Sequence, residues 1–590
     1  EWDRWAYFTV NRPVAAYETV RERFIGPFRS ESNPIALERG LGSEDMDCGN
    51  AVAALEVDLE IGPGESADVI FSLGVIAKPE FERTKAEVVG KFRDAGSVDA
   101  ALDRVREAWD RFFSHTRAAT PDAEADVFLN FWTPYQAKVA FDVGRVVSFY
   151  YWGIGRGFGY RDTAQDTIAM AIADAARARA RVGLLARQMR RDGKVYHHFY
   201  GDGQGEFTDH CDDPLWFILA ATEYLKETGD LGLLDAAEPF LDGGEGTVLD
   251  HLMAAAGFAG ANLGPHGLPK FGRGDWNDTL DYIGGKDGGE SVWGAMFYVA
   301  MLDRLAELLD FVKAGGRGDA VRELRGRLAG AIEAHAWDGA WYIRAFGEAG
   351  RKIGSKANAA GRIFINTQSW AVIAGLADRA RLVRAMDSLA EHLDTPYGPK
   401  ICAPAFREID PAIGLITRCV PGKKENGAVF CHPAAWAIQA ECLLGRGERA
   451  YAYFKKLLPG RIDQELFSAE PYVYSQYITS DEHPTAGKAS HSWQTGTAAW
   501  MYRVAYDHIL GVRPSYEGLV IDPVVPRAWT RFRVERVFRG ARYIIEVENP
   551  DGVERGVRSI EVDGERVDGP VAPRPAGAVC RVGVRMGREE

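Results

Sequence analysis

The chain has 590 residues, of which 46% are hydrophobic and 26% charged, so it is long enough for two or three domains with buried cores. Its formal net charge of −14 argues against nucleic acid or an anionic membrane as a partner, because both require a cationic surface. No apolar run approaches the roughly 18 to 20 residues needed to cross a bilayer.

The cysteines and the first residues indicate where the protein works. Seven cysteines are scattered without a C-x-x-C pair, and their odd number favours a reducing compartment over a disulfide framework. We therefore expect a cytoplasmic protein. The chain begins at Glu1 without an initiator Met or a signal peptide, which we interpret as a piece cut from a longer protein.

Residues 1–80 have the alternation of β-strands. Apolar residues alternate over 51–61, the pattern breaks at Gly62-Pro63-Gly64, and it resumes over 67–75, which predicts a hairpin. One sheet layer cannot bury itself, so we expect only part of a β-sandwich here. Residues 81–122 become charged and helical in period, which predicts a helical linker.

Residues 123–512 repeat long apolar helices separated by loops rich in glycine and aromatic residues. About a dozen helices without parallel-type strands between them predict a toroid of α-hairpins, and long loops at one end of such a scaffold are where sites lie. Residues 513–590 turn to β-structure again, with predicted strands at 519–521, 542–548 and 559–562. The clearest predicted helices are 163–190, 214–227, 291–313, 319–336, 369–377, 381–393, 434–444 and 497–510.

The loop 272–280, GRGDWNDTL, combines two carboxylates with a tryptophan. An indole ring can stack on the apolar face of a pyranose while carboxylates bind its hydroxyls, so this composition suits a sugar site. The residues leave open whether Asp275 or Asp278 does the chemistry. They also leave open a surface turn in which Trp276 fills a core.

The loop 153–166, GIGRGFGYRDTAQD, contains glycines without the spacing of a dinucleotide fingerprint. Thr163-x-x-Asp166 resembles a capping box and Asp162 an N-cap, which would explain the acids without any ligand. Capping does not explain the nearby cations, which suit a phosphate or sugar hydroxyls. These cations are Arg145, Arg156 and Arg161.

The loop 195–213 gathers histidines and acids. His197, His198, His210 and Cys211 raise the question of a metal, but no pair has the spacing of a zinc site, so we expect none. Hydrogen bonding to a polar ligand, or plain loop structure, is favoured instead.

Two further loops offer groups for an anion. In PGKKENGAVFCHPAAW, His432 stands at the mouth of a helix, and in ASHSWQTGTAAW, Thr495 and Gly496 precede another. Helix N-termini attract anions through free N–H groups, although Thr495 could simply cap its helix and His432 could be structural. Together the loops predict a sugar site beside an anion site.

Four motifs in this order, GYRDTAQD, GDWNDTL, KKENGAVFCH and SWQTGTAAW, resemble the inverting disaccharide phosphorylases of glycoside hydrolase family 94, the cellobiose and chitobiose phosphorylases. The resemblance covers most of the chain. It implies a partial N-terminal β-sandwich (1–80), a helical linker (81–122), an (α/α)6 catalytic barrel (123–512) and a C-terminal β-domain (513–590), as a homodimer. It implies no cofactor, with inorganic phosphate as co-substrate.

The resemblance also implies roles. Asp278 matches the general acid and Asp275 does not. Residues that match the sugar-binding set are Arg156, Arg161, Asp162 and Trp276. Residues that match the phosphate site are Arg145, His432, Thr495 and Gly496, and Glu425 falls where the acceptor sugar is contacted.

The balance of charges distinguishes two mechanisms. An inverting hydrolase needs a second carboxylate to activate water, whereas phosphate is itself an anionic nucleophile that must only be aimed. One acid beside a cationic pocket favours phosphorolysis of a β-linked glucosyl or N-acetylglucosaminyl disaccharide or oligosaccharide to an α-sugar 1-phosphate. The alternatives are an inverting hydrolase on the same barrel and a non-catalytic glycan-binding protein. An acidic acceptor is conceivable because Arg418, Lys423 and Lys424 lie near the acceptor loop.

Overall fold

The computed structural model describes residues 3–46, 49–144, 147–148, 153–154, 157–201, 203–285 and 288–587. The chain divides into two compact units, Glu1–Arg111 and Phe112–Glu590. Helix α4 (Ala95–Phe113) spans the boundary between them.

The first unit contains two small antiparallel sheets. Strand β1 (Arg4–Val10) pairs with β4 (Phe71–Ala77), and β2 (Ala16–Val20) pairs with β3 (Ala51–Glu56). The predicted hairpin is therefore wrong, because β3 and β4 lie in different sheets. Leu59 and Ile61, which extended the alternation, are 45% and 51% exposed and lie beyond the end of β3. The helices of this unit are α1 (Arg21–Ile25), α2 (Ala36–Arg39) and α3 (Phe81–Gly90).

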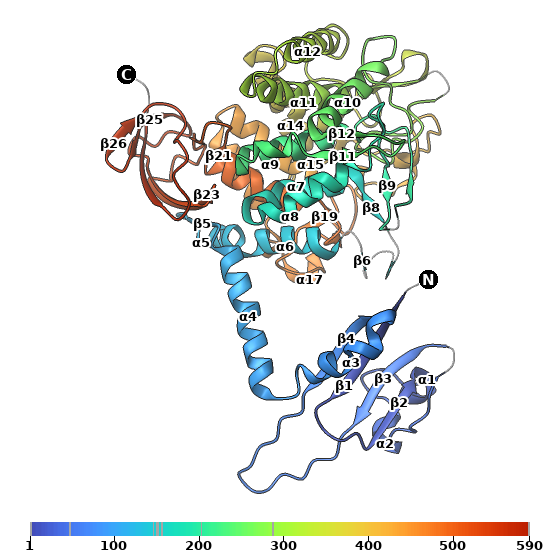
Figure 1. The fold of residues 1–590 in the computed structure, drawn as a ribbon. Helices are drawn as coiled ribbons and strands as arrows, with labels where there is room; N and C mark the ends of the chain where they lie inside the picture. Colours follow the sequence, from blue (N-terminus) through green and yellow to red (C-terminus); the bar gives the residue numbers. More distant parts are fainter. Residues whose placement is uncertain are drawn as a thin grey trace. The chain divides into compact units, whose positions relative to one another are not determined.

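The second unit is built on a ring of helices (Figure 1). Among the described residues, six helices pack each against the next, and the last packs against the first, so the ring is closed. Most of their residues are buried, as expected for helices that are apolar on all sides. In ring order they are α7 (Tyr160–Ala173), α9 (Leu215–Thr228), α11 (Val292–Phe311), α13 (Ile365–Ile373), α15 (Cys431–Leu443) and α18 (Thr497–Arg503). After α18 the chain continues as a π-helix, Val504–Ile509.

Other helices pack on this ring from outside. They are α6 (Thr133–Val139), α8 (Ala175–Ala186), α10 (Val248–Ala261), α12 (Gly316–His335), α14 (Arg379–Leu393) and α16 (Gly447–Lys456). Two shorter helices complete the set, α5 (Ala123–Val127) and α17 (Gln464–Phe467). The pattern predicted α9, α11, α12, α14 and α15 correctly in place and type.

Two helix predictions need correction. The predicted helix 163–190 is two helices, because Asp174 leaves the helical conformation and its side chain accepts a hydrogen bond from the backbone N–H of Arg177, which caps α8. The predicted helix 369–377 begins earlier, at Ile365. The first turn was missed because Asn366, Thr367 and Gln368 are polar and break the apolar pattern, although all three are buried.

Short strands lie in the loops between the helices, several of them directly before a ring helix. They are β6 (Val147–Ser148), β7 (Gly153–Ile154), β8 (Phe158–Gly159), β9 (His198–Phe199), β10 (Gly205–Glu206), β11 (Ala237–Pro239), β12 (Glu245–Thr247), β13 (Glu290–Ser291), β14 (Ala345–Phe346), β15 (Lys352–Ile353), β16 (Ile363–Phe364), β17 (Cys402–Ala403), β18 (Val429–Phe430), β19 (Ser475–Ile478) and β20 (Ala489–Ser492).

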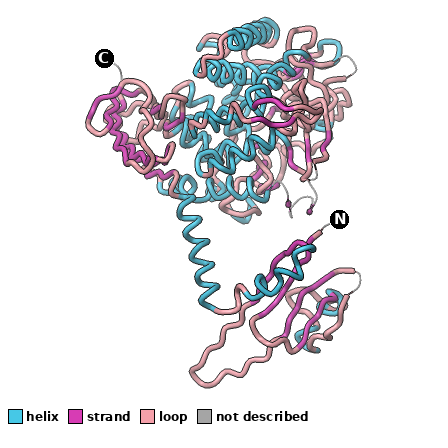
Figure 2. The backbone as a smooth tube through the Cα atoms, viewed as in Figure 1, coloured by secondary structure: helices cyan, strands magenta, loops and turns pink. Residues whose placement is uncertain are grey.

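The C-terminal residues form a sheet whose strands stand apart from the helices in Figure 2. As far as the structure describes the chain, this sheet has six strands in the order β26-β25-β27-β24-β23-β5, and only β24 and β27 run parallel. The strands are β5 (Thr116–Ala119), β23 (Arg531–Phe538), β24 (Ala541–Glu548), β25 (Val557–Val562), β26 (Glu565–Val567) and β27 (Val579–Met586). A separate ladder pairs β21 (Val512–Pro514) with β22 (Leu519–Ile521). The three strands predicted after residue 513 are confirmed as β22, β24 and β25.

Strand β5 was not predicted, since it lies inside the segment 81–122 that was expected to be helical. It pairs with β23, which comes more than 400 residues later in the chain. The C-terminal sheet therefore includes a strand from the segment before the helical ring. Four residues are too few to show an alternating pattern, and the partner strand is far away in sequence.

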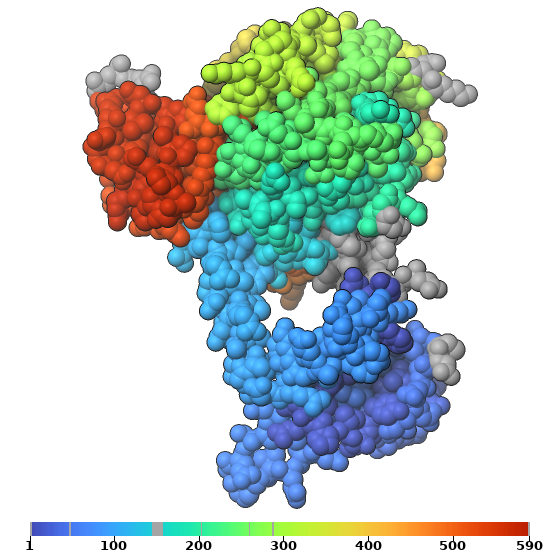
Figure 3. All heavy atoms as spheres, viewed as in Figure 1, coloured from blue at the N-terminus to red at the C-terminus, as the bar shows by residue number. Residues whose placement is uncertain are grey.

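A buried ionic network joins the C-terminal sheet to the ring, and Figure 3 shows the two parts in direct contact. Arg536 on β23 donates to Glu227 on α9 at 2.7 Å and to Asp507 at 2.9 Å. Arg503 donates to the same two carboxylates at 2.9 and 3.1 Å. All four side chains are buried, so each charge depends on its partners.

In the part of the chain that the structure describes, no helix combines the length and apolar character required for a membrane span. The cysteines of that part, Cys211, Cys402, Cys419, Cys431, Cys442 and Cys580, are all free thiols.

Candidate active site

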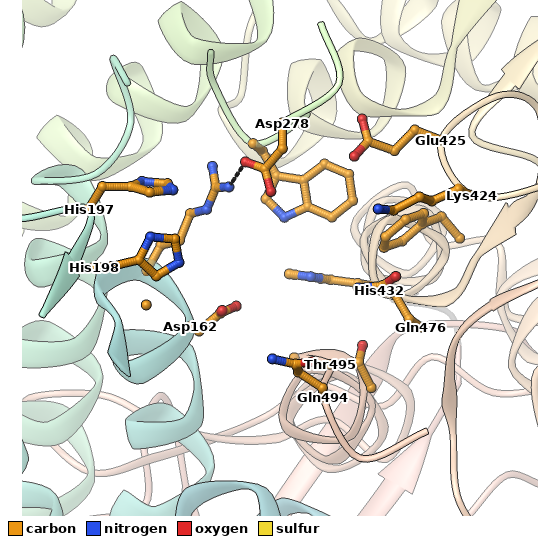
Figure 4. Close-up of a pocket in the computed structure, with 15 residues that line it drawn as sticks. Asp162, His197, His198, Asp278, Lys424, Glu425, His432, Gln476, Gln494 and Thr495 are labelled. Carbon is orange, nitrogen blue, oxygen red and sulfur yellow. Dashed lines mark hydrogen bonds and ion pairs between the residues drawn. The ribbon is translucent and has the colours of Figure 1, made fainter. Parts of the chain in front are cut away.

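A cavity of about 210 Å³ lies at the N-terminal ends of α7, α15 and α18 (Figure 4). Its lining includes Arg161, Asp162, Trp276, Asp278, Glu425, His432, Thr495 and Gly496. These are eight of the ten site residues named from the sequence. The other two, Arg145 and Arg156, lie outside the described residues. Four separate loops thus converge on one cavity.

Asp278 and Arg161 form an ion pair at this cavity. The same guanidinium donates to the carbonyl oxygen of Asp275 at 2.7 Å, so α7 is tied directly to the loop 272–280. The Asp278 side chain is 60% exposed because it faces the cavity. Burial within the protein would raise the pKa of Asp278, but Arg161 and then His210 lower it well below its usual range. The arrangement therefore favours an ionised Asp278.

Asp275 lies in the wall behind the cavity and is fully buried. Its carboxylate pairs with Arg344 at 2.5 Å and accepts hydrogen bonds from the Ser291 hydroxyl at 2.6 Å and the backbone N–H of Asn277 at 3.0 Å. The loop also needs Gly272, which has φ +61° and would place a Cβ atom 1.8 Å from the carbonyl oxygen of Asp209. The loop is thus held from both ends.

Trp276 reaches the cavity with only a small part of its ring, since it is 8% exposed. The ring packs edge to face against Phe430, His432 and Trp436, with centroids 5.1 to 5.2 Å apart. The interpretation in which Trp276 fills a core therefore describes most of its surface. The remainder is available to a ligand.

His432 and Thr495 lie across the cavity from Asp278 in Figure 4, and Gly496, which follows Thr495, also lines the cavity. His432 is the second residue of α15, and the Thr495 hydroxyl accepts a hydrogen bond from the N–H of Thr497 at 3.1 Å as α18 begins. Gly496 permits the close approach of these loops, because a Cβ atom there would lie 3.3 Å from the His432 ring. The helix ends, the imidazole and the hydroxyl form a site suited to an anion.

Asp162 also lines the cavity, and the predicted capping box next to it is wrong. Helix α7 already begins at Tyr160, with Gly159 as its N-cap. The Thr163 hydroxyl donates to the carbonyl oxygen of Gly159 at 2.7 Å instead of accepting from the helix end. Neither Asp162 nor Asp166 is therefore the N-cap residue of α7.

Glu425 is a second carboxyl group in the cavity wall and is 5% exposed. Its Oε2 atom accepts hydrogen bonds from Asn277 Nδ2 at 2.9 Å and from the Thr279 hydroxyl at 2.6 Å, the two residues that flank Asp278. Burial and the charge of Asp278 raise the pKa of Glu425 to about 7. Of the carboxyl groups that line the cavity, Asp278 thus favours its ionised form, whereas the raised pKa of Glu425 favours its protonated form.

Lys424, next to Glu425, lines the cavity, whereas Arg418 and Lys423 do not. Lys424 has φ +49°, a left-handed conformation that side-chain-bearing residues seldom adopt. Of the three cations near the acceptor loop, one therefore reaches the site. Sequence reasoning missed Phe430, Gln476 and Gln494 in the lining. Gln494 adjoins Thr495 and could have been found, but Gln476 stands in β19 without any motif.

The loop 195–213 contacts Asp278 through His210, and His197 holds His210 in place. His210 lies with Nε2 3.6 Å from Asp278 Oδ1, its ring stacks on His197 at 4.1 Å, and its Nδ1 bonds the Thr208 hydroxyl at 2.6 Å. His197 Nδ1 in turn bonds Asp213 at 2.9 Å. His197 and His198 also line the cavity.

Within the described residues, His197, His210 and Asp213 form one group whose potential metal-ligand atoms lie within 4.8 Å of one another. The spacing in the sequence gave no sign of this group. Its side chains are already engaged in the hydrogen bonds above. Burial opposes a positive charge on His197, but Asp213 outweighs it and raises the pKa of His197. The contacts of the three side chains are those of a hydrogen-bond network that supports a cationic imidazole.

A carboxyl group facing an anion-binding site inside a helical ring is the arrangement of an enzyme that acts on glycosidic bonds. Residues 108–511 match the catalytic domain of the glycosyl hydrolase 94 superfamily, and residues 1–95 match the glycosyl hydrolase 94 supersandwich domain. The chain belongs to this superfamily and is an enzyme of the glycoside phosphorylase class. It has an N-terminal supersandwich domain and a helical catalytic domain. The family resemblance of the four motifs is confirmed.

Three relatives illustrate the range of the family. An N,N'-diacetylchitobiose phosphorylase of Vibrio furnissii is 36% identical over 98% of this chain and 75% of its own length. A solabiose phosphorylase of Paenibacillus borealis is 31% identical over 94% of this chain and 71% of its own length. A 3-O-beta-D-glucopyranosyl-beta-D-glucuronide phosphorylase of the same organism is 30% identical, over 98% and 75%. Because all three are enzymes, the interpretation as a non-catalytic binding protein is set aside.

Solved structures with low identity share the fold. A bacterial glucoamylase in complex with acarbose superposes with a TM-score of 0.54 at 13% identity, covering 86% of this chain and 72% of the other. A GH78 rhamnosidase of Bacillus sp. GL1 gives 0.50 at 14% identity, over 81% and 44%.

Proposed function

We propose that the protein catalyses inverting phosphorolysis of a β-linked disaccharide or oligosaccharide, releasing an α-sugar 1-phosphate. Asp278 protonates the glycosidic oxygen while inorganic phosphate attacks the anomeric carbon from the opposite face. His432, Thr495 and Gly496 hold the phosphate, and Arg145 joins them. Arg156, Arg161, Asp162 and Trp276 hold the sugar that is transferred, and Glu425 contacts the acceptor.

The observation that supports this proposal is the position of Asp278 opposite His432 and Thr495 in one cavity. A carboxyl group on one side and the N-terminal ends of α15 and α18 on the other match the two faces of a sugar ring in an inverting displacement. Phosphate carries its own negative charge, so helix ends and an imidazole suffice to desolvate and aim it.

A general acid must carry a proton, whereas Arg161 keeps Asp278 ionised. We infer that a sugar bound in the cavity changes this balance. It removes water from the carboxylate, and desolvation raises the pKa of a carboxyl group. Protonation of Asp278 is then coupled to substrate binding.

The donor sugar is glucose or N-acetylglucosamine. The relatives named above act on different disaccharides, so the family alone does not choose between them. The deciding test is the reverse reaction. α-Glucose 1-phosphate and α-N-acetylglucosamine 1-phosphate are each offered with a panel of neutral and acidic acceptor sugars, and phosphate release is measured. Release with one donor identifies it, and no release with any pair would contradict the proposal.

One observation favours a second candidate, an inverting hydrolase, because Glu425 supplies a further carboxyl group near Asp278. The pKa of about 7 that burial gives Glu425 would suit a general base, but Glu425 lies at the same side of the cavity as Asp278 in Figure 4. The base of an inverting hydrolase acts on the opposite face of the sugar, so phosphorolysis is the better supported reaction. Cleavage of a disaccharide with and without phosphate separates the two reactions. A hydrolase yields free sugar at the same rate in both, whereas a phosphorylase is inactive until phosphate is added.

We further propose that the closed ring with its outer helices is an (α/α)6 barrel. The proposed domains are the partial β-sandwich (1–80), the helical linker (81–122), the barrel (123–512) and the C-terminal β-domain (513–590). We also propose a homodimer. Light scattering on the purified protein measures the mass of the assembly and tests this.

A further inference from the structure

We propose that Glu425 and Asp278 act together as one proton donor, in which Glu425 stores the proton and passes it to Asp278 through a hydroxyl group of the bound acceptor sugar. The inference rests on the proposed function and assigns Glu425 a role beyond contact with the acceptor. Asp278 remains the group that protonates the glycosidic oxygen. The new element is that Glu425 supplies the proton to Asp278.

The first step of the argument is the environment of Glu425 Oε2. This atom accepts from Asn277 Nδ2 at 2.9 Å and from the Thr279 hydroxyl at 2.6 Å. The orientation of the Asn277 side-chain amide is fixed, because its Oδ1 accepts hydrogen bonds from Arg344 at 2.8 Å and from Asn366 at 3.2 Å. Its Nδ2 must therefore be the atom that faces Glu425. Oε2 is therefore committed to accepting hydrogen bonds and does not carry the proton.

The second step places the proton on Oε1. Within the described part of the chain, Oε1 has no hydrogen-bond partner. Glu425 and Asp278 are both part of the cavity lining and lie at the same side of it in Figure 4. A proton on Oε1 is then available to a sugar hydroxyl bound between the two carboxyl groups.

The third step is the charge balance of the cavity. Arg161 forms an ion pair with Asp278 and stabilises its negative charge, whereas Glu425 has no arginine among its ionic partners in the described residues. The carboxylates of Asp278 and Glu425 would repel each other in one cavity, so together they hold one proton more readily than none. That proton resides on Glu425, because Asp278 is the one paired with Arg161.

The other titratable groups around Glu425 are Lys424, Cys402 and Cys419. Burial raises the pKa of both thiols, so they stay neutral near pH 7. Lys424 favours the ionised form of Glu425, but burial and then the charge of Asp278 outweigh it and raise the pKa of Glu425 to about 7. Histidine His210 faces Asp278 and lowers the pKa of that residue further.

The proton balance closes over one turnover. The O–H bond of Glu425 breaks and its electron pair stays on Oε1, while a proton is delivered to the carboxylate of Asp278. Asp278 then gives a proton to the glycosidic oxygen as the C–O bond breaks, and the bonding pair remains on the acceptor oxygen. Monohydrogen phosphate forms the new C–O bond and releases its proton to water as the product becomes a dianionic sugar phosphate, and Glu425 takes a proton from water when the products leave.

The test compares two leaving groups. The substrates are the disaccharide that supports turnover and the 2,4-dinitrophenyl β-glycoside of the same donor sugar, whose phenolate leaves without protonation. For Glu425→Gln we expect kcat on the disaccharide to fall by about 100-fold or more, the size of a general-acid effect, and kcat on the aryl glycoside to fall by less than about fivefold. An equal loss on both substrates, or a change confined to the KM of the acceptor, would overturn the proposal.

A pH profile on the disaccharide gives a second, independent measurement. In the wild type we expect kcat/KM to decline as the pH rises through about 7, where Glu425 loses its proton. In Glu425→Gln this decline should move to lower pH, and in Glu425→Asp it should stay near its original position. A decline at the same pH in Glu425→Gln would refute the proton store even if that variant is poorly active. Wild-type protein without any phosphate-dependent cleavage would instead contradict the proposed function itself.

Discussion

Arg161, one residue into helix α7, forms an ion pair with Asp278, which lies 117 positions further along the chain. The same guanidinium donates to the backbone of Asp275 and lies 3.4 Å from the carboxylate of Asp212. One buried cation therefore sets the position of the candidate acid, anchors the loop that carries it and influences its charge. Through Arg161, helix α7 therefore determines both the position and the charge of Asp278.

Asp278→Asn should abolish turnover while the protein stays folded. The amide cannot donate a proton to the glycosidic oxygen as a carboxylic acid does, and the loss of general-acid catalysis lowers rates by about 10²- to 10⁴-fold. The measurement is phosphate release in the reverse reaction together with the melting temperature. Asp281→Asn is a matched control directly after this loop, since Asp281 does not line the cavity and accepts a hydrogen bond from the N–H of Leu415 at 2.8 Å. Substantial activity in Asp278→Asn would rule out the assignment.

Gly496→Ala should weaken phosphate binding. The added Cβ atom would lie 3.3 Å from the His432 ring, so either the imidazole or the loop must shift. Overpacking costs about 1–3 kcal/mol, which corresponds to a rise of roughly 5- to 150-fold in the KM for phosphate if the strain falls on that site. Initial rates at varied phosphate concentration measure it.

The control for this variant is Gly257→Ala on α10, where a Cβ atom meets nothing within 4 Å. That substitution should leave the KM for phosphate unchanged and stabilise the helix slightly. An unchanged phosphate KM in both variants would separate Gly496 from the phosphate site.

Arg536→Met should destabilise the protein through the junction between the C-terminal sheet and the ring. Among the described residues, the variant leaves Arg503 as the one cation that pairs with the buried Glu227 and Asp507, and breaking a buried ionic network costs about 3–5 kcal/mol. Denaturant unfolding measures the loss. Arg531→Met on the same strand is the control, because Arg531 is 70% exposed and its pairing with Glu548 should contribute less than about 1 kcal/mol. Equal midpoints for the two variants would show that the network does not stabilise the junction.

Glu441 should make stability depend on pH. It is fully buried near the C-terminal end of α15, and burial raises its pKa from 4.5 to about 7 although Arg446 and Arg449 lie 3.5 and 3.6 Å away. A carboxyl group whose pKa is raised by folding stabilises the native state at low pH, and this contribution is lost as the pH rises from about 4.5 through 7. The loss is on the order of 3 kcal/mol.

Glu441→Gln removes this titration, so its stability relative to the wild type should increase between pH 5 and pH 8. Melting temperatures across that range measure the difference. Glu323→Gln on α12, where Glu323 is 72% exposed, should show no such trend. A constant difference between wild type and Glu441→Gln at every pH would contradict the raised pKa.

The sequence alone determined the type of most elements and the loops that matter. The long apolar stretches of α9, α11 and α15 show their helical period locally, and the four motifs lie at loop positions that the pattern exposes. These features depend on residues close in sequence, since helix formation and capping are local. The eight described residues of the proposed site could be named in advance because their motifs resemble a known family, although nothing local said that they would share one cavity.

Only the tertiary structure decided the pairings. Strand β4 pairs with β1 and not with β3, which precedes it in the chain, and β5 pairs with β23. Packing between residues far apart in sequence selects these partners. Contacts between distant residues also determine the site. Asp275 forms an ion pair with Arg344 outside the cavity lining. Asn277 and Thr279, on either side of Asp278, donate hydrogen bonds to Glu425. Charges and burial created by these distant contacts, and not the spacing of two aspartates, separate the candidate acid from its structural neighbour.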